Sequence, residues 1–159
     1  MKPDRITLQR SYPAAPETIW QLWTTPEGIG SWWAPDGFVV EVQQLELRPG
    51  GTLLYTMTAV GAAQVEFMAN AGMPLSTTSR KTFTELDQPR RLGYQSLIDF
   101  VPGRQPYQQL TGIELVAAGE HTEVRMTMDP LHDAEWTQRL VAGRGNELDN
   151  LAAVLAARG

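Results

Sequence analysis

Cysteine is absent from the sequence, and its absence excludes several kinds of site together. The protein has no disulfide, no thiolate zinc site, no iron–sulfur cluster and no thiol nucleophile. Positive charge is also scarce, since 13 Lys and Arg residues face 18 Asp and Glu residues, for a net charge of -5. A protein that grips phosphate backbones has the opposite balance, so we expect no nucleic-acid partner.

Long hydrophobic runs are missing as well. The longest apolar stretches, such as residues 50–55 and 151–157, are far shorter than the roughly 18 residues of a membrane-spanning helix. Residues 1–5 lack the apolar segment of a secretory signal peptide. We therefore expect a cytoplasmic protein with no membrane insertion.

What the sequence does contain is the composition of one folded domain. Hydrophobic residues make up 42% of the 159 residues, and no low-complexity tract, linker or internal repeat interrupts them. A chain of this length forms one average domain. We expect a single domain over residues 1–159.

The hydrophobic pattern predicts the order of the secondary-structure elements. Apolar and polar residues alternate over residues 5–12, which predicts a strand; Pro16 then opens a short helix, and a second one follows over residues 25–35. Alternation between glycine and proline turns predicts six further strands, over residues 38–47, 52–58, 80–86, 91–100, 110–116 and 122–128.

A long helix is predicted over residues 133–157, with Asp133 as its N-cap. It would measure roughly 37 Å, enough to cross a domain. Apolar residues recur in it at helical spacing and predict a buried stripe made of Trp136, Leu140, Leu148, Leu151 and Leu155. The antiparallel sheet is the surface that this helix can cover.

Residues 62–71 (AAQVEFMANA) interrupt the series of strands with a predicted short helix. Gly72 and Pro74 end it, and Phe67 and Met68 give it an apolar side. We expect this insert to lie at the open end of the layer between sheet and long helix, where it could act as a lid.

Four motifs resemble one protein family in both kind and order. They are residues 12–20 (YPAAPETIW), 32–38 (WWAPDGF), 47–51 (LRPGG) and 89–92 (PRRL). The chain resembles the Aha-type family, the homologues of the C-terminal domain of the heat-shock ATPase activator, within the START-like (SRPBCC) superfamily. The resemblance implies the α+β helix-grip fold of birch-pollen-allergen-type proteins. In that fold a curved antiparallel sheet wraps a long C-terminal helix, and two short helices follow the first strand.

The same resemblance favours a cavity between the sheet and the long helix. Methionine and aromatic side chains on faces expected to point inward suit a pocket for an apolar molecule, although they could also simply fill the core. The candidate ligand-binding residues are Tyr55, Met57, Phe67, Met68, Phe83, Tyr94, Phe100, Trp136, Leu140 and Arg144.

Arg144 has two open interpretations. It shares a helical face with Leu140, Leu148 and Leu151, so it could point inward and would then need Glu114, Asp99 or a ligand carboxylate as a partner. Alternatively, the helix turns it to the rim, where its stem covers apolar surface and its charge stays in water.

Candidates for catalysis are few. Residues 28–30 and 143–145 begin like glycine loops but do not complete G-x-G-x-x-G, and we interpret them as turn or helix-packing glycines. His132 lies in an acidic cluster at the start of the long helix, for which helix capping is favoured over proton chemistry or metal binding. We predict no catalytic residue, no metal and no cofactor.

Three functions follow as hypotheses. The favoured one is binding of a small hydrophobic or aromatic molecule in the cavity. An enzyme of the cyclase or hydratase kind would need a titratable group with a perturbed pKa in the same cavity. A module that interacts with a chaperone would need a large exposed patch; this partner is less favoured, and homodimer formation stays open.

Overall fold

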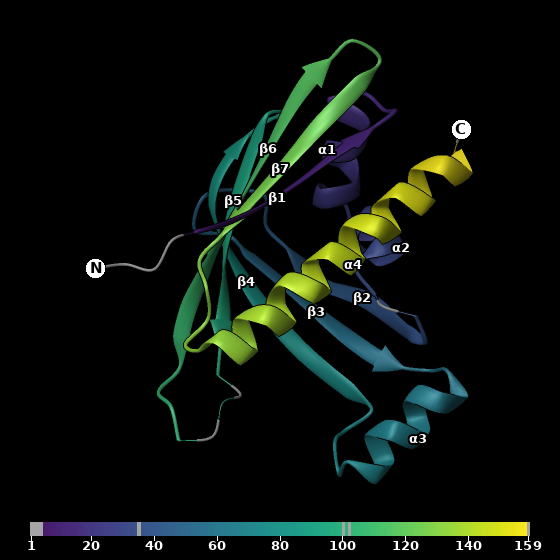
Figure 1. The fold of residues 1–159 in the computed structure, drawn as a ribbon, viewed down its shortest axis with the longest axis vertical. Helices are drawn as coiled ribbons and strands as arrows, with labels where there is room; N and C mark the ends of the chain where they lie inside the picture. Colours follow the sequence, from purple (N-terminus) through teal and green to yellow (C-terminus); the bar gives the residue numbers. More distant parts are fainter. Residues whose placement is uncertain (1–4, 35, 100, 102, 159) are drawn as a thin grey trace.

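The structure is a computed structural model that describes residues 5–34, 36–99, 101 and 103–158. Its elements follow the predicted order: β1 (Ile6–Tyr12), α1 (Pro16–Thr24), α2 (Pro26–Trp32), β2 (Phe38–Leu45), β3 (Thr52–Ala59), α3 (Ala62–Asn70), β4 (Ser76–Asp87), β5 (Arg91–Ile98), β6 (Tyr107–Ala118), β7 (His121–Met128) and α4 (Ala134–Arg158). Over these residues the strands form one antiparallel sheet in the order β1-β7-β6-β5-β4-β3-β2. The predicted helix-grip fold is confirmed (Figure 1).

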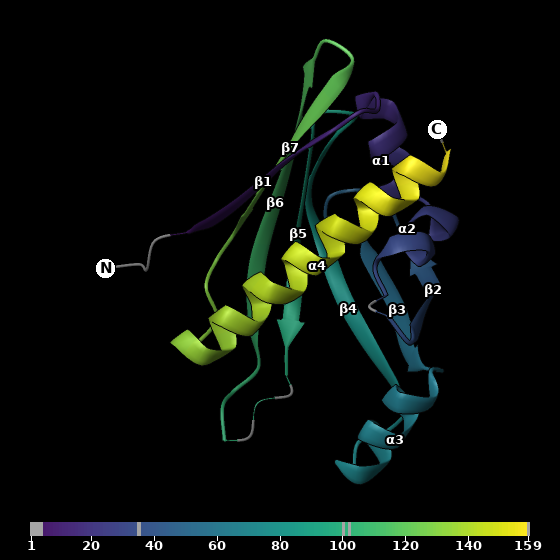
Figure 2. The same ribbon diagram turned by 45° about the vertical axis from the view of Figure 1, so that its right-hand side comes forward.

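Helix α4 runs diagonally across one face of the sheet, and α1 and α2 lie on the same side (Figures 1 and 2). Polar contacts with β1 and α2 hold α4 in place. The Tyr12 hydroxyl on β1 donates a hydrogen bond of 2.7 Å to the Leu148 carbonyl. The Asn150 amide donates to the carbonyl of Trp32, at the end of α2, at 3.3 Å. The second half of α4 is thereby tied to both β1 and α2.

The start of α4 is capped as predicted. The Asp133 carboxylate accepts a 2.8 Å hydrogen bond from the Trp136 backbone N–H, which satisfies one of the free donors of the first helical turn. The buried stripe is confirmed for Leu148, Leu151 and Leu155, which are at most 7% exposed. Trp136 and Leu140, in the first half of the helix, are only partly buried.

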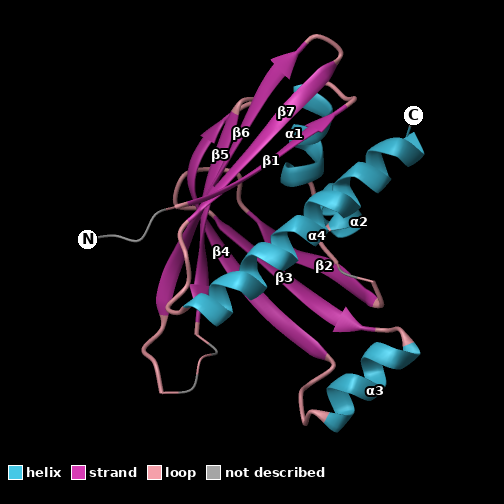
Figure 3. Ribbon diagram, in the orientation of Figure 1, coloured by secondary structure: helices cyan, strands magenta, loops and turns pink. Residues whose placement is uncertain are grey.

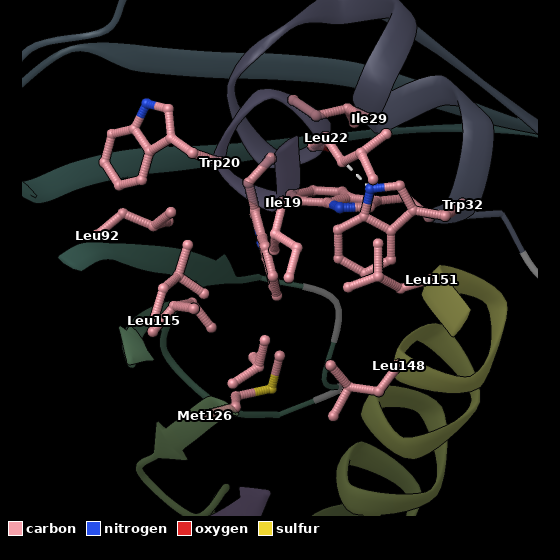
Figure 4. Close-up of a cluster of buried hydrophobic side chains, with 14 of the residues drawn as sticks. Ile19, Trp20, Leu22, Ile29, Trp32, Leu92, Leu115, Met126, Leu148 and Leu151 are labelled. Atoms are coloured by element: carbon pink, nitrogen blue, oxygen red, sulfur yellow. Dashed lines mark hydrogen bonds between the residues drawn. The ribbon is translucent and has the colours of Figure 1, made fainter. Parts of the chain in front are cut away.

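The core is densest where α1 and α2 pack between the sheet and α4 (Figure 4). Helix α1 is apolar on more than one side, and Ile19, Leu22 and Trp23 are at most 1% exposed. The Trp32 indole N–H donates to the Leu22 carbonyl at 2.8 Å, which links the two short helices. Most of the tryptophans therefore serve the core.

Two strands are longer than their hydrophobic pattern predicts. Strand β4 begins at Ser76 rather than Arg80, because its polar first residues pair with β3 from Thr58 onward. Strand β6 begins at Tyr107, which pairs with Ile98 of β5. Polar residues near a sheet end have no apolar alternation to reveal them, but the neighbouring strand still supplies backbone partners.

The insert forms helix α3, as predicted, but it stands apart from the other helices at the end of the β3–β4 pair (Figure 3). Phe67 is 65% exposed, whereas Met68 is 7% exposed. Val60, Met73 and Leu75, which flank α3, are also large exposed hydrophobic residues.

The described helices include none that is long and apolar enough to cross a membrane.

Candidate functional site

A cavity of about 270 Å³ lies between the first half of α4 and strands β3, β4 and β5. The strands contribute Tyr55, Ser79, Arg80, Lys81, Ser96, Leu97 and Ile98 to its lining. Leu131 and α4 close the other side, with Trp136, Arg139, Leu140 and Arg144. Trp136 and Leu140, both only partly buried, line the cavity, and Leu140 also packs against the core.

Lys81 is a buried cation on the sheet side of this cavity, and it is 4% exposed. It points inward because side chains alternate along a strand and Phe83, two residues later, lies in the core. Its amino group donates a 2.7 Å hydrogen bond to the Ser96 hydroxyl on β5. No ion pair joins Lys81 to a carboxylate in the described part of the chain.

Three aromatic rings surround the Lys81 amino group. Its nitrogen lies 5.1 Å from the ring centre of Tyr94, 5.6 Å from that of Trp33 and 5.7 Å from that of Tyr55. Aromatic faces attract a cation, but less strongly than water or a carboxylate does. Burial, followed by the charge of Arg144, lowers the pKa of Lys81 to about 7. Near neutral pH, Lys81 is therefore divided between its charged and neutral forms.

Arg144 contributes a second cation from α4. Its side chain is 16% exposed and donates a 2.8 Å hydrogen bond to Glu147, one turn further along the helix. Arg144 lines the cavity, and its partner is Glu147 rather than Glu114 or Asp99. Glu114 instead forms ion pairs with Arg91 and Arg125, and Asp99 is exposed.

Two buried polar atoms beside Lys81 have no hydrogen-bond partner among the described residues: the Arg144 Nε and the Trp33 Nε1. Trp33 is 4% exposed and stacks edge-on against Tyr55. Buried N–H groups without a partner carry a free-energy penalty that a bound acceptor removes. Of these residues, Lys81 and Arg144 line the cavity, whereas Trp33 is not among its lining residues.

Five of the candidate residues predicted from the sequence gather at this site. Tyr55, Trp136, Leu140 and Arg144 line the cavity. Tyr94 is 2% exposed and forms part of the aromatic surroundings of Lys81. Burial raises the pKa of the Tyr55 and Tyr94 hydroxyls, so both stay protonated at neutral pH and can donate hydrogen bonds.

The other candidate residues do not line this cavity. Phe83 is buried in the core, and Met57 packs against the core from its edge. Phe67 and Met68 belong to α3, whose nearest strand is β3, and the insert supplies none of the described lining residues. Phe100 lies outside the described residues. Helix α3 therefore does not line the cavity, and its role as a lid stays a prediction.

Sequence reasoning missed Lys81, Ser96, Trp33 and Glu147. A signal existed for Lys81, because alternation from Phe83 places it on the inward face of its strand. On β5, alternation from Tyr94 and Ile98, which are both buried, likewise places Ser96 on the inward face of its strand. Glu147 gave no such signal, since a residue three positions after Arg144 is as easily a solvated surface partner.

Other hollows and clusters are less suited to a ligand. A groove of about 590 Å³ near Pro16 and Pro89 is larger, but its arginines are exposed and already paired with carboxylates. His132 accepts or donates a 2.7 Å hydrogen bond with the Tyr107 hydroxyl. Within the described ranges, no three His, Asp or Glu side chains gather as metal ligands.

Comparison with known proteins identifies the family. The family model described as "Activator of Hsp90 ATPase homolog 1-like protein" matches residues 13–156. A search of the curated proteins found no match.

Several solved structures share the fold. A crystal structure from Chromobacterium violaceum superposes with a TM-score of 0.77 at 22% identity, covering 95% of this chain and 96% of that one. An AHSA1-like protein from Aeromonas hydrophila, solved by NMR, has a TM-score of 0.77 at 19% identity, with 98% and 94% coverage. The AHSA1 protein from Silicibacter pomeroyi has a TM-score of 0.75 at 18% identity, with 98% and 100% coverage. The structural likeness shows the fold, and the family match over most of the chain shows that this protein belongs to the Activator of Hsp90 ATPase homolog 1-like family.

Proposed function

We propose that the protein binds a small aromatic or hydrophobic molecule that carries an acidic group, in the cavity between the sheet and α4. The aromatic and aliphatic walls, with Tyr55, Trp136 and Leu140, favour an apolar body. The cations Lys81 and Arg144 favour an anionic end.

The observation that carries this proposal is the charge balance of the cavity. Arg144 and Glu147 neutralise each other, so a protonated Lys81 leaves one buried positive charge without a counter-ion. Burial of an unpaired charge costs several kcal/mol in a folded protein. A ligand carboxylate would supply the missing charge between Lys81 and Arg144, which both line the cavity.

Thermal unfolding with a panel of aromatic and aliphatic acids tests the proposal. A ligand at 100 times its dissociation constant adds about 2.7 kcal/mol to the free energy of unfolding. For a domain of this size, the unfolding midpoint then rises by roughly 5–10 °C. We expect this rise with carboxylates and not with the amides of the same compounds.

Arg144→Leu provides the specificity control. It should reduce the midpoint rise with carboxylates, because the guanidinium no longer contacts the acid. Arg139→Leu is the matched comparison, since Arg139 also borders the cavity but is exposed and already paired with Glu135; it should leave most of the rise intact. If no compound raises the midpoint, the cavity proposal is wrong and a protein partner becomes the better hypothesis.

A second candidate function is catalysis in the same cavity. The enzyme hypothesis requires a titratable group with a perturbed pKa, and Lys81 meets that requirement. A lysine that is partly neutral at pH 7 can act as a base or as a nucleophile. Ligands that are consumed, rather than only bound, would favour this alternative.

A further inference from the structure

We propose that Lys81 is an amine nucleophile that forms a Schiff base with a small oxo acid, whose carboxylate is bound by Arg144. The inference rests on the proposed function, because it uses the same cavity and the same acidic ligand. The inference adds that the ligand has a carbonyl group and that Lys81 bonds covalently to its carbon.

The geometry presents the Lys81 amine to a ligand. Lys81 is one of the residues that line the cavity. Its amine donates a 2.7 Å hydrogen bond to Ser96 and lies 5.1–5.7 Å from the centres of three aromatic rings. Since no described carboxylate pairs with it, forming a covalent bond breaks no ion pair. The guanidinium of Arg144, which lines the cavity from α4, offers an anchor for an acid.

The protonation state favours the reaction. A lysine attacks a carbonyl only as the neutral amine, and an ordinary lysine is almost wholly protonated at pH 7. Burial and the charge of Arg144 lower the pKa of Lys81, so at neutral pH Lys81 holds a larger fraction of neutral amine than an ordinary lysine does. Desolvation beside another cation is a recognised way to activate a lysine.

The reaction balances without an oxidant or reductant. The nitrogen lone pair forms a C–N bond to the carbonyl carbon, and the carbonyl π electrons move to oxygen, which takes the proton released by nitrogen. The resulting carbinolamine loses its hydroxyl with one proton as water, and a C=N bond forms. The Ser96 hydroxyl, hydrogen-bonded to the amine, is placed to relay that proton.

Charge explains why the ligand is an oxo acid rather than a neutral ketone. The Schiff base carries a positive charge when protonated, and that charge would lie in an apolar cavity close to Arg144. A neutral ketone leaves it uncompensated, which is unfavourable. The carboxylate of an oxo acid cancels it and also pairs with the guanidinium.

Reductive trapping tests the inference directly. The protein is incubated with pyruvate or phenylpyruvate and sodium cyanoborohydride, which reduces a C=N bond to a stable amine. The adduct adds the mass of the oxo acid less one oxygen atom, and peptide mapping locates it. The sequence suits this test, because Lys2 and Lys81 are its two lysines. We expect Lys81 to be labelled at least about ten times faster than Lys2, in keeping with its larger neutral fraction.

Matched variants separate a specific site from general amine chemistry. Lys81→Arg keeps the charge but removes the nucleophile and should abolish the adduct at position 81, and Lys81→Met should do the same without a buried charge. Lys2→Arg should leave trapping at Lys81 unchanged. Arg144→Leu should slow trapping of phenylpyruvate but not of phenylacetone, which has a methyl group in place of the carboxylate.

Two outcomes distinguish failure of the inference from failure of the proposed function. If phenyllactate, which has no ketone, raises the unfolding midpoint while oxo acids leave Lys81 unlabelled, the Schiff base is wrong and acid binding stands. If neither phenyllactate nor phenylpyruvate raises the midpoint and labelling is equal at Lys2 and Lys81, both are wrong.

Discussion

Lys81 shows how one residue takes its chemistry from its surroundings. Its own strand gives it only an inward direction, whereas β5 supplies a hydroxyl, α4 supplies a second cation, and three aromatic rings exclude water. The same side chain on the outer face of β4 would be an ordinary solvated lysine. Its pKa is therefore a property of the tertiary structure, and it makes stability depend on pH.

The free energy of unfolding should rise as the pH increases from about 7 to 9.5. In this range the unfolded chain keeps Lys81 protonated while the folded chain does not, so unfolding takes up a proton and higher pH opposes it. The slope approaches about 1.4 kcal/mol per pH unit. Above this window the buried hydroxyls of Tyr55 and Tyr94, with raised pKa, act in the opposite direction.

Urea unfolding at a series of pH values measures this dependence, and Lys81→Met supplies its control. The variant should lose the slope between pH 7 and 9.5 and should be more stable than the parent at pH 7, where the parent still carries a partly charged lysine. An unchanged slope in the variant would show that another group is responsible.

At the scale of elements, glycine has different roles in helices α2 and α4. In α2, a Cβ added to Gly28 would lie 2.5 Å from the Gln21 carbonyl oxygen and 2.7 Å from the Leu22 Cα, so the glycine allows α2 to approach α1. In α4, a Cβ added to Gly143 would meet no atom of the described residues within 4 Å. Gly28 is thus a packing glycine, as predicted, whereas Gly143 serves no close contact.

Opposite effects on stability are expected from alanine at these two positions. Gly143→Ala should raise the free energy of unfolding by about 0.5–1 kcal/mol, because alanine is the better helix former. Gly28→Ala should lower it by about 1–3 kcal/mol, because backbone atoms must move to admit the methyl group. Chemical denaturation of both variants checks the pair; a stabilising Gly28→Ala would contradict the close approach of α1 and α2.

At the scale of the whole molecule, the chain divides into a packed body and a protruding insert. The body holds the sheet, α1, α2 and α4 around one core, whereas α3 extends beyond the β3–β4 pair and exposes Phe67. The insert should therefore contribute little to the stability of the body or to ligand binding in the cavity.

A pair of alanine substitutions compares the two parts. Leu151→Ala removes a side chain that is 0% exposed and should cost about 2–5 kcal/mol of unfolding free energy. Phe67→Ala should change it by less than about 0.5 kcal/mol, as is usual for an exposed residue. The midpoint rise with acidic ligands should be the same in Phe67→Ala as in the parent. A smaller rise would support the prediction that α3 acts as a lid.

The sequence by itself determined the order of elements, the inward faces of the strands, the Asp133 cap and the family. These features follow from local periodicity and short motifs, which the residues carry wherever the chain goes. The tertiary structure alone decided that Arg144 and Lys81 line one cavity, that Glu147 pairs with Arg144, and that α3 supplies none of the described lining residues. Each of these depends on how α4 is rotated about its axis and on how elements distant in the sequence meet. Burial, the cause of the unusual chemistry of Lys81, exists only once those elements have packed together.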